Sequence, residues 1–217
     1  MRYDAVLYDL DGTLIDSIPS ILKAFRQTFL DVTGDPGDET YFLSTIGIPL
    51  SEAFEPFDPA LRQRLFDVCK EYSDRYLRET ADIFPRIRED LRGLQCEGVR
   101  QGVVTSKRRE PARYSLEKFE IVDFFEVIVT KEDTERHKPF PDPLLEGVRR
   151  LGISDPAGVL YVGDSVHDLR CARNAGMDCA VVEWTRMPRE EIAAESPRFW
   201  IRYLKEDISC ILCGGEL

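Results

Sequence analysis

The chain has 217 residues, of which 43% are hydrophobic and 32% are charged, and this composition is typical of a globular protein with a sizeable core rather than of a disordered chain. Its formal net charge of −11 argues against nucleic acid as the main partner, because duplex binding needs a basic face, whereas a small anionic substrate needs only a local positive site. The apolar run near the start is too short for a signal peptide and no later stretch is long enough to span a bilayer, so we expect a cytoplasmic protein without a membrane partner.

The first predicted element is a buried strand over residues 5–8, which ends at the motif DLDGT of residues 9–13. Asp9 and Asp11 thus stand where a strand ends, and Gly12 allows the backbone to turn sharply. Open α/β sheets bind ligands at the carboxyl ends of their strands, so one carboxylate can attack a substrate while the other moves protons. An ordinary turn is the alternative explanation, since Asp and Gly are also common turn residues.

A helical segment follows, in which we predict no strand. Apolar residues of positions 18–29 share one helical face behind Ser17, a candidate N-cap residue. A second helical pattern covers 61–76 after the start signal Asp58-Pro59. We therefore predict an α-helical insertion after the first strand, which we call the cap (residues 16–84), and we expect it to overhang the strand ends.

Strands and helices alternate over the rest of the chain. The further predicted strands cover residues 102–104, 127–129, 159–162 and 180–182. Such alternation predicts a parallel, doubly wound sheet. The expected fold class is therefore α/β, with a Rossmann-like core (residues 1–15 and 85–217) into which the helical cap is inserted.

Polar clusters follow the strands of this predicted sheet. Thr105-Ser106-Lys107 follows the second strand, Lys138 lies in the loop beyond the third, and residues 163–168 follow the fourth. Because the carboxyl ends of parallel strands meet at one edge, we expect these side chains to gather around Asp9 and Asp11. Their types match what phosphoryl transfer requires, namely a nucleophile, a proton donor, a cation, a hydroxyl and carboxylates for a metal.

An oxygen-rich metal site is part of this expectation. Asp9 and Asp164, with a carbonyl from the turn between the two aspartates, would suit Mg²⁺, which would offset the repulsion between a carboxylate nucleophile and an anionic substrate. Each cluster also has an ordinary explanation, because Thr105 can cap a strand end and Lys138 can be a solvated loop residue. Asp164 and Asp168 can likewise be helix N-terminal acids, yet the occurrence of all the clusters at successive strand ends favours a site.

In this order, DLDGT, VVTSK, the lysine of KPFPDP and GDSVHD resemble the four motifs of the haloacid dehalogenase superfamily. They are most similar to its phosphoglycolate phosphatase-like branch, which has a helical cap after the first strand. The resemblance covers nearly the whole chain, and as an ordered set the motifs are highly specific. It implies that Asp9 attacks phosphorus to give an aspartyl-phosphate, and that Asp11 protonates the leaving alcohol and then activates the hydrolytic water.

The same resemblance implies roles for the other motif residues. Thr105 and the amide of Ser106 would bind phosphate oxygens, and Lys138 would neutralise the nucleophile and the phosphate. Asp168 would support the metal through its ligands or through water. The residues implied for Mg²⁺ are Asp9, Asp11 (by its carbonyl), Asp164 and Asp168.

Three positions bear on the activity within the superfamily. Asp11 favours phosphate ester chemistry, because haloalkanoate dehalogenases lack an acid at that place. Ser106 stands where an asparagine is common in the related phosphatases, which weakens assignment to any one named activity. Arg86 stands where a glycine is usual before the cap returns to the core, and we expect an effect on hinge geometry alone.

Basic residues and two histidines lie next to the motifs. Lys107 can contact phosphate or attract a second anionic group of the substrate, together with Arg108 and Arg109, although we expect the two arginines to be solvated. We expect His137 and His167 to be ordinary loop residues rather than members of the site.

Two further segments leave alternatives open. Residues 45–50, with Gly47 as a candidate substrate contact, resemble the substrate-facing loop of helical caps, but a simple interhelical turn explains them as well. The cysteines favour buried, reduced thiols over disulfides, and Cys210 and Cys213 form a CxxC without a second CxxC or a nearby histidine, which disfavours a zinc or redox site.

The function predicted from the sequence is a Mg²⁺-dependent phosphatase for a small phosphorylated metabolite, acting as a monomer or homodimer. A phosphosugar mutase similar to β-phosphoglucomutase is the nearest alternative, and a catalytically silent module that binds a phosphometabolite is an alternative of another class. A phosphoglycolate-like substrate, a sugar phosphate, a nucleotide and pyrophosphate all fit the core motifs. We expect the cap to choose among them.

Overall fold

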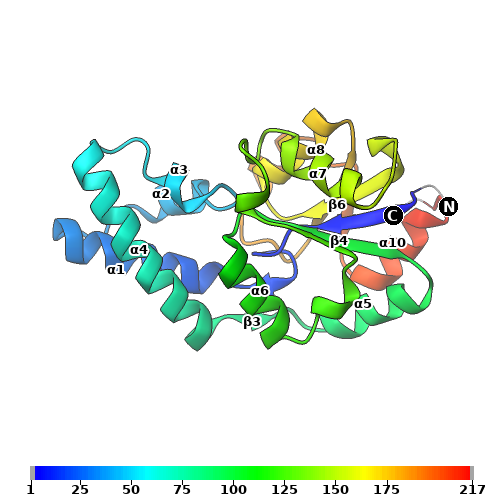
Figure 1. Ribbon diagram of the computed structural model, residues 1–217, viewed down its shortest axis with the longest axis horizontal. Helices are drawn as coiled ribbons and strands as arrows, with labels where there is room; N and C mark the ends of the chain where they lie inside the picture. The colour runs from blue at the N-terminus through cyan, green and yellow to red at the C-terminus, as the bar shows by residue number, and fades with distance from the viewer. Residues whose placement is uncertain (1–2, 216–217) are drawn as a thin grey trace.

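A six-stranded sheet runs through the larger part of the computed structural model, which describes residues 3–215 (Figure 1). The strand order is β5-β4-β1-β6-β7-β8, and every neighbouring pair is parallel. The strands are β1 (Ala5–Tyr8), β4 (Arg100–Val104), β5 (Val127–Val129), β6 (Val159–Gly163), β7 (Asp178–Val182) and β8 (Phe199–Ile201). The predicted parallel, doubly wound α/β sheet is confirmed. The additional strand β8 was not predicted.

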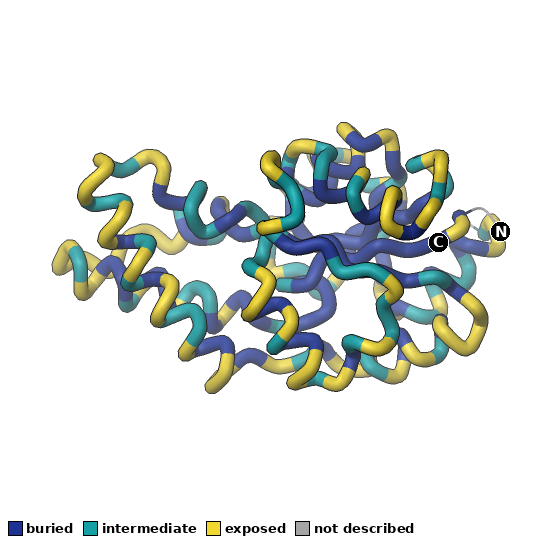
Figure 2. Tube along the Cα trace, viewed as in Figure 1, coloured by how far each residue is buried: buried dark blue, intermediate teal, exposed yellow. Residues whose placement is uncertain are grey.

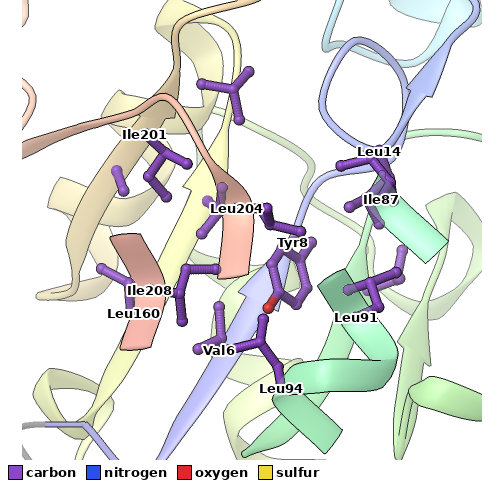
Figure 3. Packing of buried hydrophobic residues seen from close by; sticks show 14 of the residues in the cluster. Val6, Tyr8, Leu14, Ile87, Leu91, Leu94, Leu160, Ile201, Leu204 and Ile208 are labelled. Atoms are coloured by element: carbon purple, nitrogen blue, oxygen red, sulfur yellow. The ribbon is translucent and has the colours of Figure 1, made fainter. Parts of the chain in front are cut away.

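Helices cover both faces of this sheet (Figure 1). One face carries α5 (Ile87–Cys96), α6 (Arg109–Lys118) and α10 (Leu204–Leu212), and the other carries α7 (Asp142–Arg150), α8 (Val166–Ala175) and α9 (Arg189–Ala194). Short 3₁₀ helices are η1 (Val122–Phe124), η2 (Lys131–Asp133) and η3 (Pro156–Gly158). Val6 and Tyr8 pack into the first layer with Leu91 (Figure 3). Ala5 and Leu7 pack into the second layer. Because alternate strand residues point to opposite faces, the continuous apolar run of β1 is buried on both sides.

The cap has a hydrophobic core of its own. Its helices are α1 (Ile18–Thr33), α2 (Glu39–Ser44), α3 (Leu50–Ala53) and α4 (Pro59–Thr80). The two long helices match the two predicted patterns, and α4 begins after Asp58, whose side chain accepts hydrogen bonds from the first-turn amides. Phe25, Phe42 and Leu65 are buried between the cap helices, whose outer surfaces are exposed (Figure 2). The short helices α2 and α3 were not predicted.

A two-stranded ribbon forms where the chain enters and leaves the cap. β2 (Ile15–Asp16) pairs antiparallel with β3 (Asp82–Ile83), so the expectation of no strand in this segment is wrong. Two residues per strand give no detectable alternation, and only the pairing of distant segments creates the ribbon. Arg186 of the core reinforces it through a bidentate ion pair with Asp16.

Arg86, the residue that departs from the family pattern, lies just after this ribbon at the N-terminus of α5. Its φ of 67° is in the left-handed region that glycine adopts readily. A residue with a Cβ pays roughly 1–2 kcal/mol for this conformation. The guanidinium donates to Glu206 of α10 at 2.6 Å and to Asp90 at 3.4 Å, and these contacts offset part of that cost. The hinge thus keeps a glycine-like backbone although the side chain is large.

The cysteines are only partly buried. None of the six cysteines is in a disulfide within residues 3–215. Cys69, Cys171 and Cys179 are buried as predicted, but Cys96 and Cys213 are exposed and Cys210 is half-buried, so the expectation of burial is wrong for these three. The CxxC lies at the end of α10, on the side of the molecule opposite the cap (Figure 1).

Within residues 3–215, none of the helices combines the length and the apolar character that crossing a membrane requires.

Candidate active site

The strand order places the predicted site at a reversal of the chain's winding direction. In sequence order the six parallel strands follow the arrangement 3-2-1-4-5-6, so the reversal lies between β1 and β6. Crevices at such switch points, outside the carboxyl ends of the strands, are where open α/β sheets bind ligands. Asp9 follows β1 and Asp164 follows β6, and the amide of Asp9 donates to Val162. The two aspartates thus lie on adjacent strands at the switch point.

Lys138 is a fully buried charged group of the site. Its Nζ lies 2.7 Å from Asp9 Oδ1 and 2.8 Å from Asp168 Oδ1, and its side chain is 0% exposed. The alternative of a solvated loop lysine is therefore wrong. Burial alone would lower the pKa of Lys138, but the charges of Asp168 and Asp9 outweigh it, and the pKa lies above its ordinary value. Conversely, burial raises the pKa of Asp9 to about 7, although Lys138 partly opposes this.

Asp164 is a buried carboxylate that forms no ion pair with the residues the structure describes. Among residues 3–215, its Oδ2 has no hydrogen-bond partner, and its Oδ1 only meets the hydroxyl of Thr13 at 3.4 Å. Burial raises the pKa of Asp164 well above its ordinary value, and the nearby charges of Asp168 and Asp9 add to the effect. Carboxylate oxygens of Asp9, Asp164 and Asp168 lie within 4.8 Å of one another. A divalent cation would satisfy this arrangement, because hard cations prefer carboxylate oxygens.

Gly12 makes the close approach to Asp164 possible. It has a φ of 84°, and a Cβ at this position would lie 2.2 Å from Asp164 Oδ2. No other residue fits without moving the carboxylate. The residues present therefore fit a divalent cation, which Asp9 and Asp164 would hold.

Asp168 has both oxygens occupied by donors. Oδ1 accepts from Lys138 and from the hydroxyl of Tyr161 at 3.0 Å, and Oδ2 accepts from the amide and hydroxyl of Ser165 and the amide of Asp164. Ser165 and Asp168 form the capping box that starts α8. Although burial favours its protonation, Lys138 and these hydrogen bonds keep the pKa of Asp168 below its ordinary value. This geometry suits a residue that positions Lys138 and the loop at Asp164.

Asp11 is held by two residues, one of them unforeseen. Lys107 Nζ lies 2.7 and 3.0 Å from its two carboxylate oxygens, and the hydroxyl of Ser17 donates to Oδ1. Ser17 is the N-cap residue of α1, as predicted, but its side chain makes no capping hydrogen bond. The start signal of a helix was the only trace of Ser17 in the sequence, and the turn from β1 into the cap redirects its hydroxyl to Asp11.

The remaining predicted contacts lie between the core and the cap. Thr105 is buried and its Oγ1 accepts from the amide of Lys107 at 3.2 Å. The hydroxyl of Ser106 donates to the carbonyl of Gly47 at 2.6 Å, so the cap loop of residues 45–50 contacts the core loop of residues 105–107. A cavity of about 120 Å³ separates the two parts, and its lining includes Asp9, Thr105, Ser106, Lys107 and Gly47.

The flanking basic residues divide into two groups. Arg109 is 60% exposed, in agreement with the expected solvation, and pairs with Asp133. The expected solvation is wrong for Arg108. Its guanidinium lies 2.5 Å from Asp74 of α4, and both side chains line the cavity. No pattern in the sequence indicated this pair, because Asp74 is one of several acids on a long helix.

The two histidines also reach the cap. His167 Nε2 lies 3.1 Å from the carbonyl of Ser44, and His137 Nε2 lies 3.8 Å from Glu52. Neither is among the residues that line the cavity.

Comparison with known proteins agrees with this geometry. The family model described as haloacid dehalogenase-like hydrolase matches residues 6–182. A protein named "Putative pyrophosphatase PpaX" from Caldanaerobacter subterraneus subsp. tengcongensis is 36% identical over 201 residues, which cover 93% of this chain and 91% of the relative. A pyrophosphatase PpaX of Bacillus cereus is 31% identical, with 93% of each chain covered.

Solved structures show the same architecture. The crystal structure of a "Putative haloacid dehalogenase-like hydrolase" from Bacteroides fragilis has a TM-score of 0.85 and 28% identity, with 94% of this chain and 99% of that chain covered. A hydrolase of Pseudomonas syringae has a TM-score of 0.85 at 19% identity and covers 98% of this chain and 100% of its own, which supports the fold alone. The matched family model, the relatives and the site geometry lead to one conclusion: this chain belongs to the haloacid dehalogenase-like hydrolases.

Proposed function

We propose that this chain is a Mg²⁺-dependent phosphatase that hydrolyses a small phosphorylated metabolite through an aspartyl-phosphate on Asp9. One observation carries the proposal. The Asp9 carboxylate lines the cavity beneath the cap, is held by the buried Lys138, and lies beside Asp164, whose Oδ2 has no partner among residues 3–215. A carboxylate nucleophile, a buried cation and an unsatisfied carboxylate at a switch point are the parts that phosphoryl transfer needs.

In the first half of the proposed reaction, a carboxylate oxygen of Asp9 attacks phosphorus, and the bond from phosphorus to the leaving oxygen breaks. Asp11 gives its proton to that leaving oxygen. In the second half, Asp11 takes a proton from water, the resulting hydroxide attacks phosphorus, and the bond to Asp9 breaks with release of phosphate. Lys107 and Ser17 orient the Asp11 carboxylate for both transfers.

The other residues stabilise charge. Lys138 neutralises Asp9 and the equatorial phosphate oxygens, while Thr105 and the Ser106 amide bind phosphate oxygens. Asp9, Asp164 and the carbonyl of Asp11 would hold Mg²⁺, whose charge offsets the repulsion between the nucleophile and the substrate phosphate.

The substrate in this proposal is small. A cavity of about 120 Å³ corresponds to the liquid volume of roughly four water molecules, at about 30 Å³ each. The relatives named pyrophosphatase make pyrophosphate the first candidate, and a phosphoglycolate-like ester is the second.

Phosphate release by the purified protein with Mg²⁺ tests the proposal. We expect turnover of at least one substrate in a panel of pyrophosphate, phosphoglycolate and hexose phosphates. Asp9→Asn should lower kcat by a factor on the order of 10⁴ or more while circular dichroism stays unchanged, because an amide does not attack phosphorus. Isomerised sugar phosphate without free phosphate would instead indicate a mutase, and binding without turnover in both wild type and Asp11→Asn would indicate a silent module.

A further inference from the structure

We infer that the leaving group of the substrate carries its own negative charge and that Arg108 binds it in place of Asp74. The inference rests on the proposed phosphatase function and narrows its substrate class. A second phosphate or a carboxylate fits the cap-facing side of the cavity, whereas the neutral polyol of a sugar does not. Arg108 is thereby a specificity-determining residue.

The charges around the cavity form three pairs when no substrate is bound. Asp9 pairs with Lys138, Asp11 pairs with Lys107, and Asp74 pairs with Arg108. Among the described residues that line the cavity, the charged ones are Asp9, Asp11, Asp74, Lys107 and Arg108. An anionic leaving group therefore has to take a cation from one of these carboxylates, because an unpaired buried charge is costly.

The pair formed by Arg108 and Asp74 is the one that can be exchanged. Lys138 is 0% exposed and is locked between Asp9 and Asp168. Lys107 contacts both oxygens of Asp11, the residue that handles the proton of the leaving oxygen.

Asp74, in contrast, has no part in the chemistry. Its side chain is 29% exposed and can turn to solvent. Releasing Arg108 therefore leaves no carboxylate buried without a partner.

The rest of the lining favours an anionic group over a neutral one. The cap contributes the apolar side chains Ile21, Phe25, Ile46, Ile48, Leu50 and Leu77. Its uncharged polar side chains among the described lining residues are Ser20, Thr45 and Ser73, and Thr45 Oγ1 already donates to the carbonyl of Phe42. A polyol would bring several hydroxyls that need partners, but one planar guanidinium satisfies a carboxylate or phosphate with two parallel hydrogen bonds.

If Arg108 binds the substrate, substitutions of Arg108 and of Asp74 should change substrate preference in opposite directions. If the pair is only a latch, that is, a contact that fastens the cap to the core, both substitutions should affect all substrates alike. Phosphoglycolate and 2-hydroxyethyl phosphate form a matched substrate pair, because they differ in whether the leaving group carries a carboxylate or a neutral hydroxymethyl group. The quantity to measure is the ratio of kcat/KM for phosphoglycolate to that for 2-hydroxyethyl phosphate, with Mg²⁺ present. Pyrophosphate serves as a second anionic substrate.

We expect wild type to favour the anionic substrates. Arg108→Gln should lower the ratio roughly 10- to 100-fold, as for loss of a charged hydrogen-bonding group. Arg108→Lys should retain part of it. Asp74→Asn should raise the ratio, because it removes the competing carboxylate. Arg109→Gln is the matched control and should keep the wild-type ratio, since Arg109 is exposed and does not line the cavity.

Three outcomes would overturn the inference. Equal kcat/KM for the two esters in wild type would do so while leaving the proposed function intact. A loss of the same size for both substrates in Arg108→Gln and in Asp74→Asn would show that the pair is only a latch. Hydrolysis of no phosphorylated compound would overturn the proposed function together with this inference.

Discussion

The core and the cap contribute to the cavity in different ways. On the core side, Asp9, Lys138 and Asp168 are almost fully buried and are joined by ion pairs. On the cap side, contacts such as Arg108 with Asp74 and Ser106 with Gly47 join separately packed units through partly exposed groups. We therefore expect the buried groups to be held in place and the partly exposed contacts to exchange more easily.

Removal of the buried ammonium group of Lys138 should cause the largest loss of stability. Lys138→Met keeps the side-chain length but leaves Asp9 and Asp168 without their shared ammonium, and breaking a buried ion pair costs about 3–5 kcal/mol. We expect a clearly lower midpoint of chemical unfolding. Lys107→Met is the matched control on the cap-facing side, and its loss of stability should be smaller because Lys107 is 13% exposed. If the two variants lost the same free energy of unfolding, the core side and the cap-facing side of the cavity would not differ in this way.

Metal affinity should depend on pH through the core carboxylates. Burial raises the pKa of Asp9 to about 7 and the pKa of Asp164 above its ordinary value, so protons compete with Mg²⁺ for both carboxylates. The affinity should therefore rise with pH, by up to about tenfold per unit below pH 7 if one proton is released. Calorimetry in buffers of different ionisation enthalpy measures this proton release. Affinity that is flat between pH 5.5 and 8, or unchanged in Asp164→Asn, would contradict the assignment.

The smallest effect is expected at the contact between the cap loop and the core. Ser106→Ala removes the hydrogen bond to the Gly47 carbonyl, which at about 0.5–1.5 kcal/mol corresponds to a change in kcat/KM of roughly two- to tenfold. The unfolding midpoint should change little, because the bond joins two separately packed parts. In the wild-type protein the hydroxyl of Ser209 donates to Glu97, far from the cavity. Ser209→Ala should therefore leave kcat/KM at the wild-type value. A similar effect of both variants would show that Ser106 has no special role in closure.

Local pattern was sufficient for the elements with many apolar residues. The strands around Asp9 and Asp164 and the helices α1 and α4 are long or continuous enough to show their periodicity, and parallel topology then implies that polar residues after the strands converge. The pattern failed for β2 and β3, which contain two residues each and exist through pairing with each other across the cap, and it also missed β8.

The same division holds for single residues. The position of Lys138 in the loop beyond a predicted strand was sufficient to expect it near the site. Its complete burial between two carboxylates depends on packing. Ser17 was visible only as a helix cap, and its bond to Asp11 follows from the turn into the cap. Arg108 was expected in solvent, because the partner that covers it stands 34 positions earlier on another unit.

The amino-acid pattern was sufficient to predict the α/β class, the helical insertion and the residues that gather at the strand ends, since these depend on short-range periodicity and on motif residues after the strands. Only the folded chain showed which charges pair, which carboxylate oxygen of the site has no hydrogen-bond partner within residues 3–215, and how the cap meets the core. Those properties arise from burial and from contacts between segments far apart in the chain, where the energy of a charge depends on its surroundings more than on its residue type.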